Sequence, residues 1–202
     1  MTPRPRRLGL LGGSFDPVHA GHLIMAGEAV ARLKLDHLFF LPARRPAHKR
    51  SRALAPVEDR IAMLRLAVRG NPSFAVSRVE ADRPGVTYTV DTLAALTEHD
   101  PGVWYFLMGQ DSLEEFDTWR EPDRILSMAR LAVVPRGEGD HATLRPEVRR
   151  RTVFLRMPPI GISSTEIRRR LKRGQPVRYW LPDAVLDYAI DHGLYGSRRR
   201  RG

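Results

Sequence analysis

The spacing of apolar residues along the chain alternates between two patterns. Short, nearly continuous apolar runs are typical of buried strands. The sequence predicts such strands at Leu8–Leu11, His37–Leu41, Phe74–Val79, Val103–Met108, Leu131–Val134 and Thr152–Met157. Between the runs, apolar residues recur every three or four positions, which is typical of amphipathic helices. Two such helical faces consist of Leu23, Ala26, Val30 and Leu33, and of Val57, Ile61, Leu64 and Val68.

Residues that favour helix ends mark the remaining elements. Ser163 and Glu166 form a capping box at the start of a late helix, and Gly174 favours its end. The other predictions are helices over Thr89–His99 and from Pro122 to Arg130, a last helix between Pro182 and Gly193, and polar loops over 43–53 and 136–151.

Strands that alternate with helices at this spacing predict parallel strands joined by right-handed crossovers. We therefore expect an α/β fold with a doubly wound, mostly parallel sheet. In such sheets ligands bind at the carboxyl ends of the strands, where loops lead into helices. The search for chemistry narrows to the loops after the first, second, fourth and sixth strands.

The net charge of +11 raises the possibility of nucleic-acid binding. Arg4, Arg6 and Arg7, together with Arg198–Arg201, supply seven of these charges, so the body of the chain carries the remaining four. We expect residues 1–202 to form a single domain, with residues 1–7 and 197–202 as flexible basic tails. Binding of phosphorylated small molecules is then favoured over binding of nucleic acid.

The chain has no cysteine, which excludes disulfides and thiolate metal sites and fits a cytoplasmic protein. No apolar run approaches the roughly 20 residues that a membrane helix requires, so we expect no membrane association.

The stretch after the first strand combines Gly12 and Gly13 with His19 and His22. Two glycines allow a sharp turn and a close approach of a ligand to the backbone. The helix that follows offers free N–H groups and the positive end of its dipole, which suit phosphate. Each imidazole can donate a hydrogen bond to a phosphate oxygen, and a protonated imidazole would add charge.

Other interpretations of this stretch are weaker. It matches neither G-x-G-x-x-G nor G-x-x-x-x-G-K-[ST], which excludes a dinucleotide fingerprint and a Walker loop. One histidine could cap the helix while the other packs, but a pair three residues apart behind two glycines favours a ligand. Zinc held by His19, His22 and Asp16 is disfavoured, because the chain has no H-E-x-x-H motif and no cysteine. We predict no metal ligand in the protein.

A second candidate phosphate site lies at the start of the late helix. Ser163, Ser164 and Arg168 place two hydroxyls and a guanidinium fork at a helix N-terminus, which is an arrangement that clamps anions. The alternative is a capped surface helix without a ligand, because the capping box would stabilise the helix start in either case.

These residues carry a resemblance to a known superfamily. Gly12–His22 resembles the H-x-G-H element of the nucleotidyltransferases, and Ile162–Arg168 resembles their I-S-S-T-x-I-R element. The intervening segments resemble elements of the bacterial nicotinate-nucleotide adenylyltransferases: Pro46-Ala47-His48-Lys49 their P-P-H-K, Thr87–Leu93 their S-Y-T-x-D-T, and Met108–Asp111 with Trp119 their G-A-D…W. The resemblance extends from about Leu8 to Tyr195. Ser14, Ala47 and Gln110 depart from the commoner Thr, Pro and Ala.

The resemblance implies a Rossmann-like nucleotidyltransferase fold with C-terminal helices, and it implies a role for each site residue. Catalytic residues would be His19, His22, Lys49 and Arg168. ATP would be bound by Gly12, Gly13, Ser14, Phe15, His19, His22, Gly109, Asp111, Ile162, Ser163, Ser164 and Arg168. The second substrate would be bound by Ser14, His48, Lys49, Thr89 and Trp119, with the indole stacked on the nicotinate ring. Structural alternatives are a core role for Trp119, a helix cap at Asp111 or Thr89, and a solvated basic loop at Lys49.

The implied reaction is adenylyl transfer from ATP to nicotinate mononucleotide, which yields nicotinate adenine dinucleotide and pyrophosphate in NAD biosynthesis. Mg²⁺ would arrive with ATP. Nicotinamide mononucleotide and phosphopantetheine remain alternative acceptors, and a nucleic-acid-binding protein remains an alternative of another class. The oligomeric state is left open, with a homodimer as one alternative.

Overall fold

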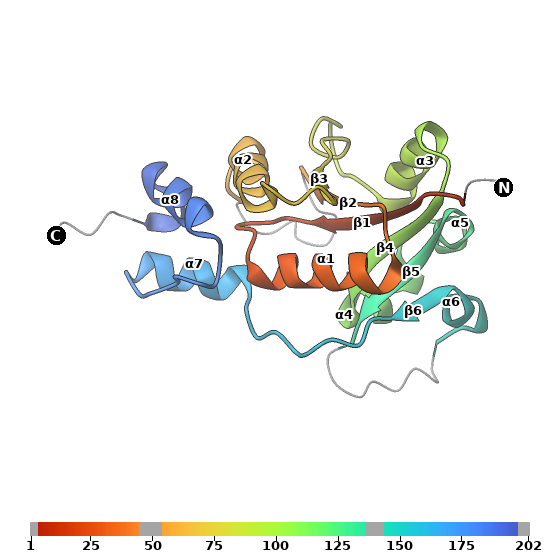
Figure 1. The fold of residues 1–202 in the computed structure, drawn as a ribbon. Helices are drawn as coiled ribbons and strands as arrows, with labels where there is room; N and C mark the ends of the chain where they lie inside the picture. Colours follow the sequence, from red (N-terminus) through yellow and green to blue (C-terminus); the bar gives the residue numbers. More distant parts are fainter. Residues whose placement is uncertain (1–3, 45–53, 136–143, 198–202) are drawn as a thin grey trace.

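Six parallel strands form one sheet in the order β3-β2-β1-β4-β5-β6 (Figure 1). The structure is a computed structural model, and it describes residues 4–44, 54–135 and 144–197. The strands are β1 (Arg7–Gly13), β2 (His37–Pro42), β3 (Phe74–Val76), β4 (Val103–Gly109), β5 (Ala129–Val134) and β6 (Thr152–Phe154). The order reverses between β1 and β4, as it does in a doubly wound fold. The predicted fold class is therefore confirmed.

The helices follow the strands in alternation. They are α1 (Ala20–Leu33), α2 (Val57–Val68), α3 (Thr89–His99), α4 (Gln110–Glu114), α5 (Pro122–Met128), α6 (Pro146–Arg151), α7 (Ser164–Lys172) and α8 (Asp183–Asp191), with short 3-10 turns η1 (Phe116–Thr118) and η3 (Leu194–Gly196).

Each face of the sheet buries its own hydrophobic cluster, because successive strand residues point to opposite faces. Leu11 belongs to the cluster packed by α1, α2, α7 and α8. Its neighbour Leu10 belongs to the cluster packed by α3, α4 and α5. Helices α7 and α8 gather at the end of the sheet where β1 ends and α1 begins (Figure 1). This arrangement brings late residues of the chain to the loop after β1.

The two edge strands are shorter than predicted. β3 ends at Val76 instead of Val79, and β6 ends at Phe154 instead of Met157. Each edge strand pairs with a single neighbour, so backbone hydrogen bonds stabilise it on one side and not on the other. The loop predicted over 136–151 is wrong in its second half, where Pro146 begins α6 and Val148 is buried. Proline favours the first position of a helix, so Pro146 was a signal for a helix start. The polar composition of the segment suggested a loop instead.

The described parts of the predicted tails differ from expectation. Arg4 pairs with Asp36 at 2.7 Å and Arg6 with Asp100 at 2.8 Å, while Arg7 begins β1. At the other end the Ser197 hydroxyl is buried and donates to the Ala189 carbonyl at 2.9 Å. Residues 1–3 and 198–202 lie outside the described residues. Within the described ranges, no helix has both the length and the apolar character needed to cross a membrane.

Candidate active site

The two histidines of the first loop lie against each other at the start of α1. Their ring centroids are 3.8 Å apart, and His19 takes extended backbone angles as the N-cap. Gly21 favours this packing, because a Cβ at that position would lie 3.1 Å from the His19 ring and would push it aside. His22 Nδ1 accepts a hydrogen bond from the His19 backbone N–H at 3.3 Å, so this geometry places the His22 proton on Nε2. In this tautomer the Nε2 atom is the hydrogen-bond donor of the ring.

The sequence left open a positive charge on either imidazole. His19 does not carry that charge near neutral pH. The side chain is 6% exposed, and burial lowers the pKa of His19 to about 4. Its Nδ1 is buried and makes no hydrogen bond within the described part of the chain. His19 is therefore a neutral imidazole with unused hydrogen-bonding capacity.

The helix that follows offers fewer free N–H groups than predicted. The Ala20 N–H donates to the Trp180 carbonyl at 2.8 Å. The N-terminus of α1 is thus partly occupied by the segment between α7 and α8. The Ala20 N–H is therefore already used within the protein and is not offered to a ligand.

Phe15 packs under the loop instead of facing a nucleotide. Its ring is 1% exposed and lies edge-on to His22, with centroids 5.0 Å apart, and to Phe40, at 5.7 Å. A Cβ on Gly13 would approach this ring to 3.1 Å, so the glycine makes room for the phenyl group. The predicted contact of Phe15 with ATP stays a prediction.

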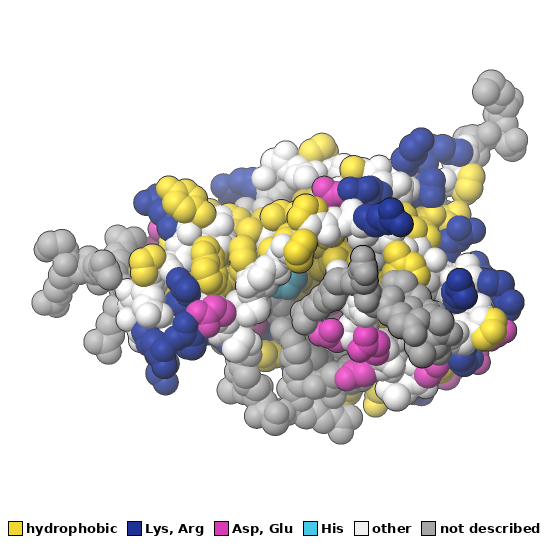
Figure 2. Space-filling view, turned by 90° about the horizontal axis from the view of Figure 1, so that it is seen from below, with side chains coloured by type: hydrophobic (Ala, Val, Ile, Leu, Met, Phe, Trp, Pro, Cys, Tyr) yellow, Lys and Arg dark blue, Asp and Glu magenta, His cyan; other side chains and the backbone are white. Residues whose placement is uncertain are grey.

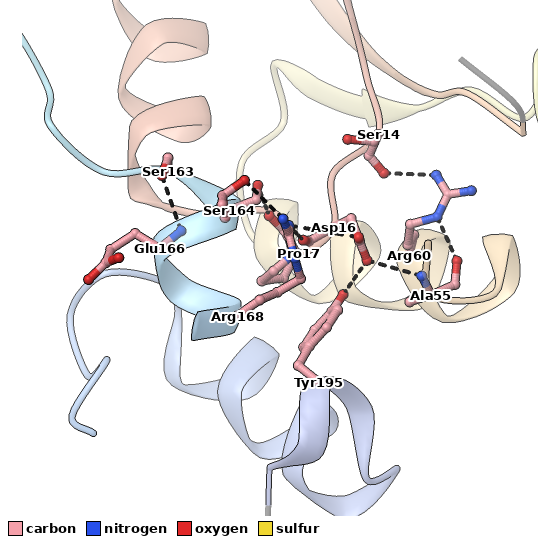
Figure 3. A network of polar contacts seen from close by, with 11 residues as sticks. Ser14, Asp16, Pro17, Ala55, Arg60, Ser163, Ser164, Glu166, Arg168 and Tyr195 are labelled. Carbon is pink, nitrogen blue, oxygen red and sulfur yellow. Dashed lines mark hydrogen bonds and ion pairs between the residues drawn. The ribbon is translucent and has the colours of Figure 1, made fainter. Parts of the chain in front are cut away.

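Asp16 is a buried anchor of the first loop (Figure 3). The carboxylate is 1% exposed and accepts from the Tyr195 hydroxyl at 2.8 Å and from the Ala55 N–H at 3.2 Å. The Arg168 guanidinium lies 3.8 Å from it and also donates to the Asp16 carbonyl. Among residues 4–44, 54–135 and 144–197, no group of three His, Cys, Asp or Glu side chains is arranged to hold a metal ion.

The second candidate phosphate site lies directly against this loop. Ser163 caps α7 and accepts from the Glu166 N–H at 3.2 Å, so that half of the predicted capping box is present. Glu166 turns its carboxylate to Arg169 and Arg170 instead of the helix start. Ser164 donates to the Pro17 carbonyl at 2.9 Å (Figure 3). The motif therefore fastens α7 to the first loop.

A cavity of about 400 Å³ extends from the first loop toward the segment before α3. Its lining includes Gly12, Gly13 and Ser14 on one side and Thr87–Thr89 and Trp119 on the other. The Trp119 ring packs edge-on against Phe106, with centroids 5.8 Å apart, and is partly exposed to the cavity. Both the core role and the ligand role considered for Trp119 are compatible with this position.

Three predicted residues lie at the neighbouring strand ends. Gly109 ends β4 and caps α4, which begins at Gln110. Asp111 sits inside the first turn of α4 and is exposed, so the alternative in which it caps a helix starting at Ser112 is wrong. Ile162 is half-buried just before α7. His48 and Lys49 lie outside the described residues.

Arg60 is a functional candidate that the motifs do not reveal. It is 1% exposed and donates to the carbonyls of Ser14 at 2.8 Å and Ala55 at 3.0 Å (Figure 3). It also donates to the Ala43 carbonyl at 2.8 Å. Burial lowers its pKa, and the nearby Asp16 charge opposes that shift. The guanidinium joins the loop after β1 to the loop after β2. A charged residue on the apolar face of α2, next to Ile61, was the available sequence signal.

Glu80 is a second buried ionisable group missed by the motifs. It lines the cavity and accepts from the Thr92 hydroxyl at 3.0 Å. Burial raises its pKa, and its hydrogen bonds with Thr92 and Thr87 and the charge of Arg83 oppose the shift. These bonds tie Glu80 to Thr87, before α3, and to Thr92 within it.

Basic side chains do not form a continuous stripe on the face of the molecule seen in Figure 2. Lys and Arg lie there in separate groups near the edges, and hydrophobic side chains occupy much of the middle. The described side chains that this view shows therefore form no continuous basic groove of the kind that follows a nucleic-acid backbone.

Comparison with known proteins places the chain in a family. Residues 10–170 match the Cytidylyltransferase-like family model. A probable nicotinate-nucleotide adenylyltransferase of Thermomicrobium roseum is 45% identical over 195 residues, covering 94% of this chain and 91% of that protein. One from Thermus thermophilus is 47% identical over 191 residues, covering 94% and 99%.

Solved structures share the fold at low identity. A Plasmodium falciparum nicotinic acid mononucleotide adenylyltransferase complexed with APC superposes with a TM-score of 0.75 at 19% identity, covering 95% of this chain and 98% of that one. The same enzyme complexed with NaAD gives 0.74. On the family match and on the identity to relatives over nearly the whole length, the chain belongs to the nicotinate-nucleotide adenylyltransferase family of Cytidylyltransferase-like proteins.

Proposed function

We propose that this protein transfers the adenylyl group of ATP to nicotinate mononucleotide. An oxygen of the mononucleotide phosphate attacks the α-phosphorus of ATP, the bond from that phosphorus to the bridging β-oxygen breaks, and pyrophosphate leaves. The product is nicotinate adenine dinucleotide. The observation that carries the proposal is the single cavity that joins the glycine loop to Thr87–Thr89 and Trp119, in a chain whose relatives bear this activity in their names.

The chemistry requires positioning and charge stabilisation more than a covalent nucleophile, because the attacking phosphate is already an anion. His22 Nε2–H and the neutral His19 ring would donate hydrogen bonds to phosphate oxygens at the mouth of α1. Gly12, Gly13 and Ser14 would lie along the phosphates through their backbone. Ser163, Ser164 and Arg168 would meet the leaving pyrophosphate from α7, and Ile162 would border the nucleotide.

The remaining assignments belong to the same proposal. Trp119 would stack on the pyridine ring beside Thr89, and Gly109 and Asp111 would contact the ATP ribose. His48 and Lys49 would reach phosphate from the loop after β2. Mg²⁺ would enter bound to the ATP phosphates, which is its usual mode in phosphoryl-transfer sites. The cysteine-free composition fits a cytoplasmic location, and a homodimer is one possible assembly.

The test is pyrophosphate release from ATP with nicotinate mononucleotide, nicotinamide mononucleotide and phosphopantetheine as separate acceptors. We expect the nicotinate substrate to give the highest kcat/KM. His22→Ala should reduce kcat/KM by about 10²–10³-fold while leaving the far-UV circular dichroism unchanged, because it removes a transition-state donor. Near-wild-type turnover in that variant would remove His22 from the mechanism, and a preference for phosphopantetheine would overturn the proposal.

A further inference from the structure

The charged side chains that line the cavity are few and differ in availability. Among the described lining residues the acidic ones are Glu80 and Glu115, and Arg120 is the only one with a positive side chain. Glu80 is 8% exposed and accepts a hydrogen bond from the Thr92 hydroxyl at 3.0 Å. Glu115 is exposed to solvent. Among these three lining residues, Arg120 is therefore the one whose charge would attract an anionic ligand.

The guanidinium of Arg120 is positioned by an aromatic ring more than by acidic partners. Its Cζ atom lies 4.9 Å from the centroid of the Tyr88 ring, which is a cation–π distance. Its nearest carboxylates are Asp91 at 3.8 Å and Glu121 at 3.6 Å, both longer than a hydrogen bond. By contrast, Arg145 approaches Asp117 at 2.7 Å. Arg120 thus rests on a cavity wall with N–H donors that no carboxylate engages closely.

Arg120 also adjoins the two features assigned to the pyridine ring. It follows Trp119 directly in the chain, and Tyr88 precedes Thr89. A ring stacked on the indole would present its substituent in the same cavity as the guanidinium. Nicotinate carries a carboxylate at this substituent, and nicotinamide carries a neutral amide.

We propose that the Arg120 side chain is a specificity-determining residue that favours the ionised acid over the amide at the pyridine ring. The inference rests on the proposed function and deepens it. A guanidinium attracts a carboxylate through charge and can donate two parallel hydrogen bonds to it, whereas it gains little charge attraction from an amide.

The expected effect is moderate, because the Arg120 side chain is 53% exposed. Exposed ion pairs are screened by water and contribute at most about 1 kcal/mol, which corresponds to about a fivefold change in relative kcat/KM. Arg120→Gln should therefore lower the acid-to-amide ratio of kcat/KM about fivefold, almost entirely through the acid. Arg120→Lys should give an intermediate ratio, because it keeps the charge and loses the fork.

A matched control is available on the neighbouring helix. Arg124 is similarly exposed, at 55%, pairs with Glu121 at 3.1 Å and does not line the cavity. Arg124→Gln should leave the ratio unchanged. The ratio of the wild type should fall as KCl is raised from 50 to 500 mM, whereas that of Arg120→Gln should stay constant, because salt screens an exposed charge.

The possible results distinguish a failure of the proposed function from a failure of the role proposed for Arg120. A wild type that releases no pyrophosphate with either mononucleotide overturns the proposed function and this inference with it. A wild type that prefers the acid, together with an unchanged ratio in Arg120→Gln, overturns only the inference. Equal losses with both substrates would show that Arg120 supports the fold of the cavity and selects neither. Quenching of tryptophan fluorescence by each mononucleotide, measured without ATP, should show the same change in relative Kd.

Discussion

Acidification should destabilise the fold through His19, because its imidazole is buried in the neutral form. Burial lowers the pKa of His19 from 6.5 to about 4. Between these two values the unfolded chain binds a proton that the folded chain does not, so stability increases as the pH rises from 4 to 6.5. With about 1.4 kcal/mol for each pKa unit, the shift corresponds to a loss of about 3 kcal/mol once the pH falls below 4.

Urea unfolding of the wild type and of His19→Gln at pH 7.5 and pH 4.5 measures this contribution. When the same proton linkage is integrated from pH 7.5 to pH 4.5, the free energy of unfolding of the wild type should fall by about 2.5 kcal/mol more than that of the variant. The comparison between proteins cancels the titration of other groups. His99→Gln, an exposed site at the end of α3, is the control and should follow the wild type. If His19→Gln and the wild type lose equal stability on acidification, His19 is not buried as a neutral ring.

Three further substitutions test how the site is held together. Arg60→Met should lower the free energy of unfolding by about 3 kcal/mol, since it leaves one buried and two partly buried loop carbonyls without this donor; an unchanged urea midpoint would contradict this. Tyr195→Phe should lower the free energy of unfolding by about 2 kcal/mol, because it removes a hydrogen bond to the buried Asp16 carboxylate. A urea midpoint equal to that of the wild type would contradict this prediction. Trp119→Ala should raise the KM for nicotinate mononucleotide more than the KM for ATP, and equal increases in steady-state kinetics would argue against stacking.

Local pattern was enough to predict the architecture and the neighbourhood of the site. Apolar runs and helical spacing placed six strands correctly along the chain, because burial imposes those periods directly on the sequence. Residues near Gly12, after β1, and near Thr89, beyond β3, line one cavity, although the strand pattern pointed only to the loops after the first, second, fourth and sixth strands. The short edge strands deviated because apolar content predicts burial and does not report how many neighbours a strand has.

The supporting contacts could not be predicted, because they join residues far apart in sequence. Nothing in the local pattern around Asp16 indicates that its partner is Tyr195, 179 positions away. The neutral state of His19 depends on burial by elements that pack around it, and the same histidine on a surface would titrate near its ordinary pKa. Arg60 was visible only as a charge on an apolar helix face, without its partners.

The fastening of the first loop by the end of the chain has a consequence for the order of events during synthesis. Ser164, Trp180 and Tyr195 all contact residues between Asp16 and Ala20. At about 5–20 residues per second, the ribosome adds the 179 positions between Asp16 and Tyr195 in about 10–40 s. The loop after β1 is therefore synthesised early but gains its last contact only when Tyr195 has been added. A nascent chain can form its central strands while the loop after β1 still lacks these three contacts, so the loop should become fixed only after Tyr195 has left the ribosome.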